Sequence, residues 1–168
     1  MIERYTRPEM GALWTPDARF SKMMEVEIAV AQAQAALRII PRAAAKAIAS
    51  KAKFSTKRIL EIERETKHDV IAFVSNMAEN VGEHGRYIHF GMTSSDVLDT
   101  ALSLQVREAG VVLGRSLDFL ERSMKKVARA HSGTLCAGRT HGMFAEPTTF
   151  GLKMSGFVAE LARNRERL

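Results

Sequence analysis

The sequence predicts an all-α protein, with an N-terminal helical domain over residues 1–93 and the first long helices of a bundle over 94–168. Two observations predict this class. Apolar residues recur at helical spacing from residue 98 to residue 127, and capping residues precede other apolar stretches of the chain. We find no convincing strand pattern, internal repeat or low-complexity segment, so helices are expected to build the whole fold.

The composition is that of an ordinary globular protein with a basic surface. Hydrophobic residues make up 46% and charged residues 26%, which excludes wholesale disorder. The net charge of +6 favours anionic partners, but the basic residues alternate with glutamates, as on a solvated helix surface. We therefore expect no nucleic-acid partner. No apolar run reaches the ~20 residues that span a bilayer, and no secretory signal is present, so a cytoplasmic location without membrane contact is expected.

The N-terminal elements follow from capping and breaking residues. Residues 1–14 are expected to form an extended arm. Thr15, Pro16 and Asp17 predict a helix start, because a hydroxyl cap, a proline in the first turn and an acid suit the positive helix end. The predicted helix runs to Ile40, before a proline, with an apolar face comprising Met24, Ile28, Ala31 and Ala35.

Two more helices and a loop are expected before the long periodic stretch. An Ala-rich helix extends to about Lys53, and Ser55 can cap the next one. That helix is expected to continue through residues 66–81 and to end near Gly82. The glycine-containing residues 82–95 are expected to form a loop.

The strongest helical signal in the chain begins at Ser95. An α-helix from there to about Ala130 would be roughly 54 Å long at ~1.5 Å per residue. Such a rod needs other long helices beside it, from this chain or from another subunit. Its apolar face is spaced by steps of three and four: Leu98, Leu102, Val106, Ala109, Leu113, Leu117, Leu120, Met124 and Val127.

The last part of the sequence predicts a second glycine-rich loop and a final helix. Residues 138–151 are expected to form the loop, and Pro147 is expected to open the helix. The helix reaches Leu168 without a stop signal, so we expect the natural chain to continue beyond it.

Three segments combine histidine with small polar residues near helix ends. Each has a structural interpretation, as a helix cap or a turn, but three such clusters in one chain favour a functional one. The segment around Thr93 also offers hydroxyls and free backbone N–H groups at a positive helix end, which suits a carboxylate or phosphate. The clusters are Thr66–Asp69, His89–Asp96, and Gly138–Gly142 with Glu146–Thr149.

The charges near these segments point to acid–base chemistry on an anionic substrate. Lys67 and Arg139 add positive charge, and histidines exchange protons near neutral pH. The chain has no zinc-binding HExxH motif, no nucleophile elbow and no P-loop, so we expect neither a metal nor a cofactor.

Three motifs, in this order and spacing, resemble the adenylosuccinate lyase family of the fumarase/aspartase superfamily. They are TKHDVIAF (66–73), GMTSSDVLDT (91–100) and GRTHGMFAEPTTFG (138–151), and the arm MIERYTRPEM (1–10) is similar too. The resemblance covers the whole chain, but only the first third or so of a full-length enzyme. It implies a helical fold of the fumarase/aspartase type and a homotetramer with shared active sites. It also implies β-elimination of fumarate from adenylosuccinate and from the succinylated aminoimidazole-carboxamide nucleotide of purine biosynthesis.

Residue roles carry over from the resemblance position by position. His141 matches the general acid, and His68 matches a catalytic group that orients the substrate and contacts its phosphate-bearing part. Lys67 and Asp69 flank His68 as substrate-binding residues.

The other implied binding residues lie outside those two motifs. Thr93 and Ser94 match binders of the succinyl carboxylates, Arg4 and Tyr5 match arm residues that hold the nucleotide, and His89 matches a supporting position near the substrate.

The sequence also departs from the family. The family's catalytic base is a serine on a mobile loop with a pattern like SSxMPxKxNP, and residues 1–168 contain no such motif. The piece alone is therefore expected to be inactive. Two alternatives remain: a superfamily sibling such as a cycloisomerase, and a non-catalytic helical oligomerisation module.

Overall fold

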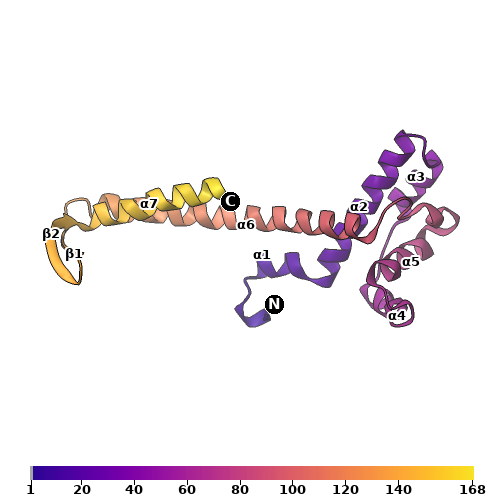
Figure 1. Ribbon diagram of the computed structural model, residues 1–168, viewed down its shortest axis with the longest axis horizontal. Coiled ribbons are helices and arrows are strands. Elements are labelled where there is room, and N and C mark those ends of the chain that lie inside the picture. The colour runs from indigo at the N-terminus through magenta and orange to yellow at the C-terminus, as the bar shows by residue number, and fades with distance from the viewer. Residues whose placement is uncertain (1) are drawn as a thin grey trace. The chain divides into compact units, whose positions relative to one another are not determined.

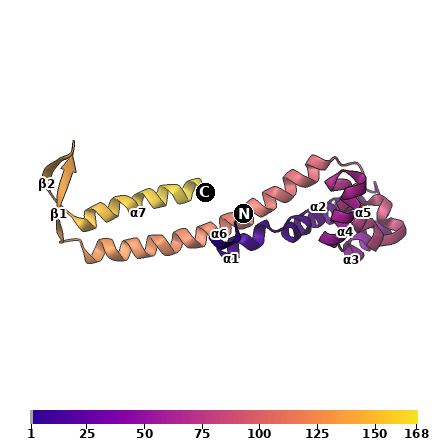
Figure 2. The same ribbon diagram turned by 90° about the horizontal axis from the view of Figure 1, so that it is seen from below.

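The computed structural model describes residues 2–168 and consists mainly of α-helices, as Figures 1 and 2 show, which confirms the all-α prediction. The chain forms two compact units, Met1–Glu108 and Ala109–Leu168. The unit boundary falls inside the longest helix, so residues 94–108 of that helix belong to the first unit. The domain boundary at 93/94, expected for the family's bundle, stays a prediction.

The N-terminal segment is helical rather than extended, so the expectation of an extended arm is wrong. It contains a 3-10 turn at Glu3–Tyr5, the short helix α1 (Pro8–Gly11) and a 3-10 turn at Ala12–Trp14. Pro8 occupies the first turn of α1, where its missing N–H costs no helix hydrogen bond.

Helix α2 (Pro16–Ala36) begins where the sequence predicts and ends earlier. The Thr15 hydroxyl accepts a hydrogen bond from the Ala18 N–H at 3.1 Å, which confirms the predicted cap. Arg38 adopts a left-handed conformation with φ 62°, so the helix cannot continue to Ile40. In the predicted apolar face, Ala31 and Ala35 are buried, and Met24 and Ile28 pack partly buried against the core.

Three helices follow α2, and the sequence predicted the last two of them as one continuous helix. They are α3 (Arg42–Lys51), α4 (Thr56–Thr66) and α5 (Asp69–Val81). Ser55 caps α4 as predicted, by accepting from the Arg58 N–H at 3.4 Å. The predicted continuation through residues 66–69 is wrong, because Lys67 takes a left-handed conformation with φ 55° and the chain turns there.

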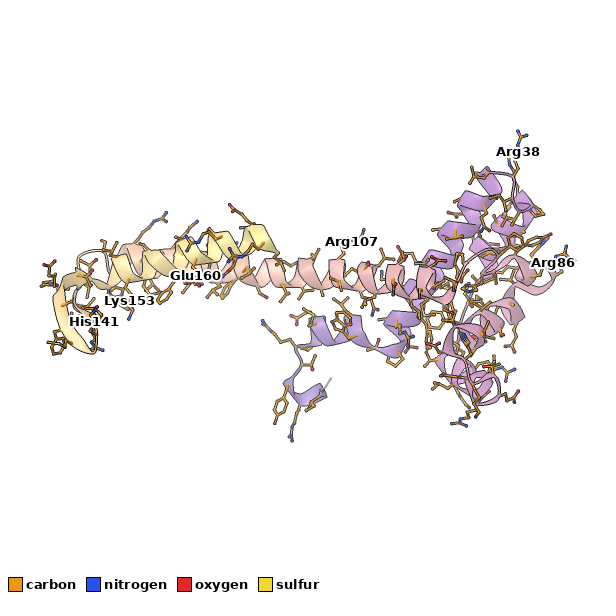
Figure 3. All side chains as sticks on the ribbon, viewed as in Figure 1. Arg38, Arg86, Arg107, His141, Lys153 and Glu160 are labelled. Carbon is orange, nitrogen blue, oxygen red and sulfur yellow. The ribbon has the colours of Figure 1, made fainter. Side chains whose placement is uncertain are left out.

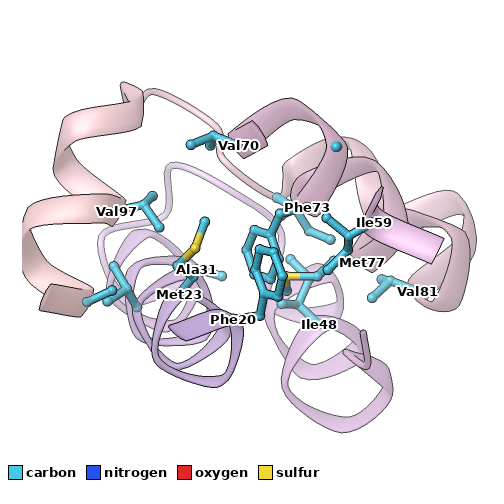
Figure 4. Close-up of a cluster of buried hydrophobic side chains, with 14 of the residues drawn as sticks. Phe20, Met23, Ala31, Ile48, Ile59, Val70, Phe73, Met77, Val81 and Val97 are labelled. Atoms are coloured by element: carbon cyan, nitrogen blue, oxygen red, sulfur yellow. The ribbon is translucent and has the colours of Figure 1, made fainter. Parts of the chain in front are cut away.

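Helices α2 to α5 and the start of the longest helix enclose the apolar core of the first unit (Figure 4). Phe73 of α5 is completely buried, and its ring stacks on that of Phe20 of α2 with centroids 5.7 Å apart. The core fixes α2 against α5. The histidine segment around His68 lies at the start of α5, and the segment around His89 contacts α2.

The longest helix, α6 (Ser94–Ala130), follows a 3-10 segment at Gly82–Tyr87 and a turn. It starts one residue before the predicted position. Several residues of its predicted apolar face are exposed in the single chain, among them Leu102, Val106, Leu113 and Leu120.

The second unit contains a hairpin that the sequence did not predict. Strands β1 (Leu135–Thr140) and β2 (Met143–Thr149) pair antiparallel, and α7 (Phe150–Arg167) follows directly. The expected loop at 138–151 is therefore mainly strand. Pro147 lies in β2 opposite Ala137, and Thr149 is the residue that caps α7, by accepting from the Leu152 N–H at 3.2 Å.

Helix α7 turns back along the second half of α6, as both views show (Figure 2). The Gly151 N–H donates to the His131 carbonyl at 2.8 Å, and a Cβ at Gly151 would lie 2.5 Å from the Ala128 carbonyl oxygen. Only glycine permits this close approach of the two helices. At the other end of α7, Arg165 pairs with Asp118 at 2.7 Å.

Among the described residues 2–168, no helix is long and apolar enough to cross a membrane.

Candidate active site

His68 faces a hollow of about 530 Å³ in the first unit, within the ~300–1,000 Å³ typical of small-molecule sites. The hollow lies between the start of α2, helix α4 and the turn that joins α4 to α5. Five charged or proton-exchanging groups come together there, and three of them are predicted site residues. Its lining is Pro16, Arg19, Phe20, Thr56, Leu60, Glu63, Lys67, His68 and Asp69.

The ring of His68 has a defined orientation, because His68 is the N-cap of α5. Its Nδ1 accepts a hydrogen bond from the Ile71 N–H at 3.3 Å. Because Nδ1 is the acceptor in this hydrogen bond, Nε2 is the ring nitrogen left to donate to a ligand. The Oδ1 atom of Asp69 lies 3.8 Å from Nδ1.

Arg19 fixes the carboxylate of Asp69 beside His68. The guanidinium donates to Asp69 Oδ2 at 2.8 Å, and the Val70 N–H donates to Oδ1 at the same distance. Burial raises the pKa of Asp69, but the hydrogen bonds from Arg19 and Val70 outweigh it and hold the pKa below its usual value. Asp69 is thus ionised at neutral pH.

The lowered pKa predicts how Asp69 stabilises the chain. Because the folded pKa lies below the unfolded one, the contribution is present above the unfolded pKa of ~3.9 and is lost as pH falls through the folded value. Asp69→Asn should therefore lower the free energy of unfolding at pH 7 by less than about 1 kcal/mol, since the pair is half-exposed. Urea unfolding at pH 7 and pH 2.5 measures the difference, which should shrink at the lower pH. Glu65→Gln is the control; a difference for Asp69→Asn that persists unchanged in acid would contradict the assignment.

The second cluster lies at the N-terminus of α6. The Thr93 N–H donates to Asp96 Oδ2 at 2.9 Å, so the side chain of the third residue of the helix closes its first turn. Within residues 2–168, the Thr93 and Ser94 hydroxyls make no hydrogen bond, and Thr93 is exposed. This helix end can therefore donate hydroxyl and backbone hydrogen bonds to an anion.

His89 precedes that helix end in a left-handed conformation with φ 61°. Its backbone N–H donates to Glu27 Oε2 at 2.9 Å, and its Nδ1 lies 2.7 Å from Glu27 Oε1. Glu27 is a buried residue of α2, so His89 is tied to the core of the first unit.

Arg4 and Tyr5 form a contact of their own. The Arg4 guanidinium lies over the Tyr5 ring, with Cζ 4.8 Å from the centroid, and Tyr5 is exposed. A cation stacked on an aromatic ring offers a planar surface and a charge.

His141 lies at the tip of the hairpin in the second unit, where Figure 3 labels it. Thr140 pairs with Met143, so His141 and Gly142 form a two-residue loop with φ 50° and 73°. Positive φ at both residues is typical of a type I′ turn, which matches the twist of the strands. The turn exposes the His141 side chain, and non-glycine residues in this conformation often mark functional sites.

The structure brings some predicted residues together and keeps others apart. Lys67, His68 and Asp69 share one hollow, and Thr93 and Ser94 share one helix end with His89 nearby in sequence. The lining of the His68 hollow does not include Thr93 or His89. His141 belongs to the other compact unit. A single site that holds all of them stays a prediction.

Sequence reasoning missed two residues that hold the predicted ones in place, Arg19 and Glu27. Nothing in the sequence distinguishes Arg19 from Lys22, the other cation of α2. Glu27 carried a usable signal, because it lies four residues from both Met23 and Ala31 and therefore shares their buried helix face.

Comparisons with known proteins agree with this architecture. Residues 3–168 match the sequence profile of the family described as Lyase. The chain is similar in structure to a fumarate lyase from Mesorhizobium sp. BNC1, with TM-score 0.86 and 32% identity over 94% of this chain and 38% of that one. It is also similar to β-carboxy-cis,cis-muconate cycloisomerase from Acinetobacter calcoaceticus sp. ADP1, with TM-score 0.87 and 28% identity over 96% of this chain and 39% of that one. The chain therefore belongs to the Lyase family.

Sequence similarity is higher to one branch. The chain is 52% identical to the adenylosuccinate lyase of Synechocystis sp. over 168 residues, and 47% identical to that of Bacillus subtilis over 167 residues. These alignments cover 100% and 99% of this chain and 39% of each relative. The chain thus spans about two fifths of the length of the curated relatives it matches.

Proposed function

We propose that the protein to which this chain belongs is an adenylosuccinate lyase. The observation that carries the proposal is the 52% identity to an adenylosuccinate lyase along the entire chain, against 28–32% for the fumarate lyase and cycloisomerase structures. The reaction is a β-elimination of fumarate from adenylosuccinate, giving AMP, and from the succinylated aminoimidazole-carboxamide nucleotide.

The elimination has two proton transfers. A base removes a proton from the carbon next to a carboxylate, and the electron pair forms the new C=C bond as the C–N bond breaks. An acid gives a proton to the departing nitrogen. We assign the acid to His141, whose side chain is exposed at the sharp turn of the hairpin. The base is expected from a part of the protein outside residues 1–168.

The anionic parts of the substrate need fixed donors. We assign the succinyl carboxylates to the Thr93 and Ser94 hydroxyls at the N-terminus of α6, where the helix dipole adds positive potential. We assign the phosphate-bearing part to His68 and Lys67. Because His68 Nδ1 accepts the Ile71 N–H, Nε2 is left as a hydrogen-bond donor toward the ligand, which supports this assignment.

The remaining assignments concern the nucleotide and the support of the site. The stacked Arg4–Tyr5 pair is assigned to the nucleotide, Asp69 to the support of the His68 turn, and His89 to the support of the α6 helix end. The proposed reaction uses no metal or cofactor.

A homotetramer with shared active sites is part of this proposal, as is a cytoplasmic location. The support is the apolar surface left exposed on α6, which a single chain does not cover: Leu102, Val106, Val111, Leu113, Phe119 and Leu120 are all at least 43% exposed. Other long helices packed on this surface would remove it from water. In such a bundle, residues from different units of different copies can meet around one substrate.

Two other functions compete. A cycloisomerase sibling has the same fold, since the TM-score to such an enzyme is 0.87, but its substrate carries no nucleotide. A non-catalytic oligomerisation module would keep the apolar α6 surface without the chemistry.

Fumarate release by the full-length protein tests the proposal. Adenylosuccinate supplied to the purified protein should give AMP and fumarate in equal amounts, and absence of both products would contradict the proposal.

Arg4→Ala separates the nucleotide enzyme from its sibling. In the full-length protein this substitution should raise KM for adenylosuccinate about tenfold or more, because it removes the cation assigned to the nucleotide and its stacking on Tyr5. Steady-state kinetics measure the change, with Arg86→Ala as a matched control, since Arg86 also stacks on a neighbouring tyrosine but lies outside the motifs. An unchanged KM would count against nucleotide binding by the arm.

A further inference from the structure

We propose that Glu27 is a positioning residue that holds the segment His89–Thr93, and through it the Thr93–Ser94 helix end, in a conformation suited to bind the substrate carboxylate. The inference rests on the proposed function for its substrate, and on contacts within the first unit for its geometry.

Glu27 is a buried carboxylate whose partners come from one residue. Its side chain is buried, with the residue 2% exposed. It lies on α2, far in sequence from the loop that it contacts. Within residues 2–168, its hydrogen bonds go to the backbone N–H of His89 at 2.9 Å and to the ring Nδ1 of His89 at 2.7 Å. Burial of a carboxylate is costly unless the carboxylate is well paired. The positions of Glu27 and of the loop at His89 therefore depend on each other.

The segment held by Glu27 has a conformation that needs support. His89 has φ 61° and Gly91 has φ 69°, so the chain turns twice through the left-handed region within three residues. Glycine adopts this region freely, but histidine does so only when its surroundings favour it. The carboxylate of Glu27 provides that support, because it accepts the N–H that the left-handed residue directs inward.

A second residue of α2 holds the next peptide group. Gln34 lies seven residues after Glu27, two turns along the same helix face, and its Nε2 donates to the Phe90 carbonyl at 2.7 Å. Two consecutive residues of the loop are thus fixed to one face of α2, through a backbone donor and a backbone acceptor.

The contacts continue from His89 to the start of α6. The Met92 N–H donates to the His89 carbonyl at 3.4 Å. The Thr93 N–H then donates to the Asp96 carboxylate, and the Asp96 N–H donates to the Thr93 carbonyl at 3.1 Å. Displacement of His89 therefore displaces the helix end. A shift of about 1 Å in a group that binds the substrate can lower activity by about 10²-fold.

The experiment compares variants of the full-length protein by two measurements, hydrogen exchange of the peptide covering residues 88–93 and steady-state kinetics with adenylosuccinate. Glu27→Ala removes both acceptors. We expect exchange in 88–93 to rise tenfold or more while the rest of the core stays protected, and kcat/KM to fall about 10- to 100-fold.

Glu27→Gln keeps a carbonyl oxygen that can accept the His89 N–H. It should restore exchange and kcat/KM to within about fivefold of the unmodified protein. Glu25→Gln, which makes the same change at an exposed site of α2, should leave both at their original values.

The outcomes separate this inference from the proposed function. If the unmodified protein releases no fumarate, the proposed function fails, and the exchange data alone still decide whether Glu27 holds the loop. Exchange in 88–93 that stays unchanged in Glu27→Ala, or that rises equally across the core of the first unit, would overturn the inference. The same holds if kcat/KM stays unchanged in a protein that does release fumarate.

Discussion

His141→Gln in the full-length protein is expected to lower turnover of adenylosuccinate by about 10²-fold or more, the effect typical of a positioned general acid. Glutamine keeps polarity and approximate length, but it cannot donate a proton and take it back near neutral pH. The reaction should lose its acid without losing the hairpin, because the turn is fixed by strand pairing on both sides of His141.

The measurement is kcat from fumarate release at saturating substrate. His84→Gln provides the control, since His84 lies in the 3-10 segment outside the three motifs and should retain kcat within about twofold. A His141→Gln protein with unchanged kcat would reject the assignment of the acid, and nearly equal losses in both variants would point to general damage.

Phe73→Ala should lower the free energy of unfolding of this chain by about 3–5 kcal/mol, the largest stability effect we expect. Phe73 is fully buried, and its ring stacks on Phe20 at 5.7 Å, so truncation leaves a cavity beside an unpaired ring. The core it supports fixes α5, which begins at Asp69 and has His68 as its N-cap.

Urea unfolding followed by circular dichroism measures this effect. Leu37→Ala is the matched control, because Leu37 is 71% exposed and should change the free energy of unfolding by less than about 0.5 kcal/mol. Equal effects of the two substitutions would contradict the packing described for the first unit.

The parts of the fold that the sequence predicted are those with local causes. The α6 periodicity and the caps at Thr15 and Ser55 depend on side chains within a few residues, and the structure confirms all three. The break at Lys67 could not be predicted in the same way. Lysine favours helix, and the chain turns there because the His68 ring caps the next helix.

The hairpin at 135–149 was missed for a different reason. Nearly all of its residues are exposed or half-exposed in this chain, so neither face is buried and the sequence shows no alternation of apolar and polar residues. Strand prediction depends on such alternation. The two-residue turn at His141–Gly142 was the remaining signal, and histidine is not among its usual first residues.

In the candidate site too, the sequence indicates residues with local signals and does not indicate residues that act through distant contacts. The residues that we expect to face the ligand lie in motifs, and the sequence indicates them through these motifs. The supporting residues, Arg19 and Glu27, act through contacts over 50 or more positions in the chain, and a helix pattern alone does not reveal such contacts.

We propose that His68, the Thr93–Ser94 helix end and His141 surround one anionic ligand in the assembled protein. A crystal structure of the full-length protein with an unreactive adenylosuccinate analogue tests this most directly. We predict hydrogen-bond distances, about 3 Å, from one ligand molecule to His68 Nε2, to the Thr93 and Ser94 hydroxyls and to the His141 ring. A structure in which the bound analogue touches only one of these groups, with the others facing no common cleft, would contradict the account.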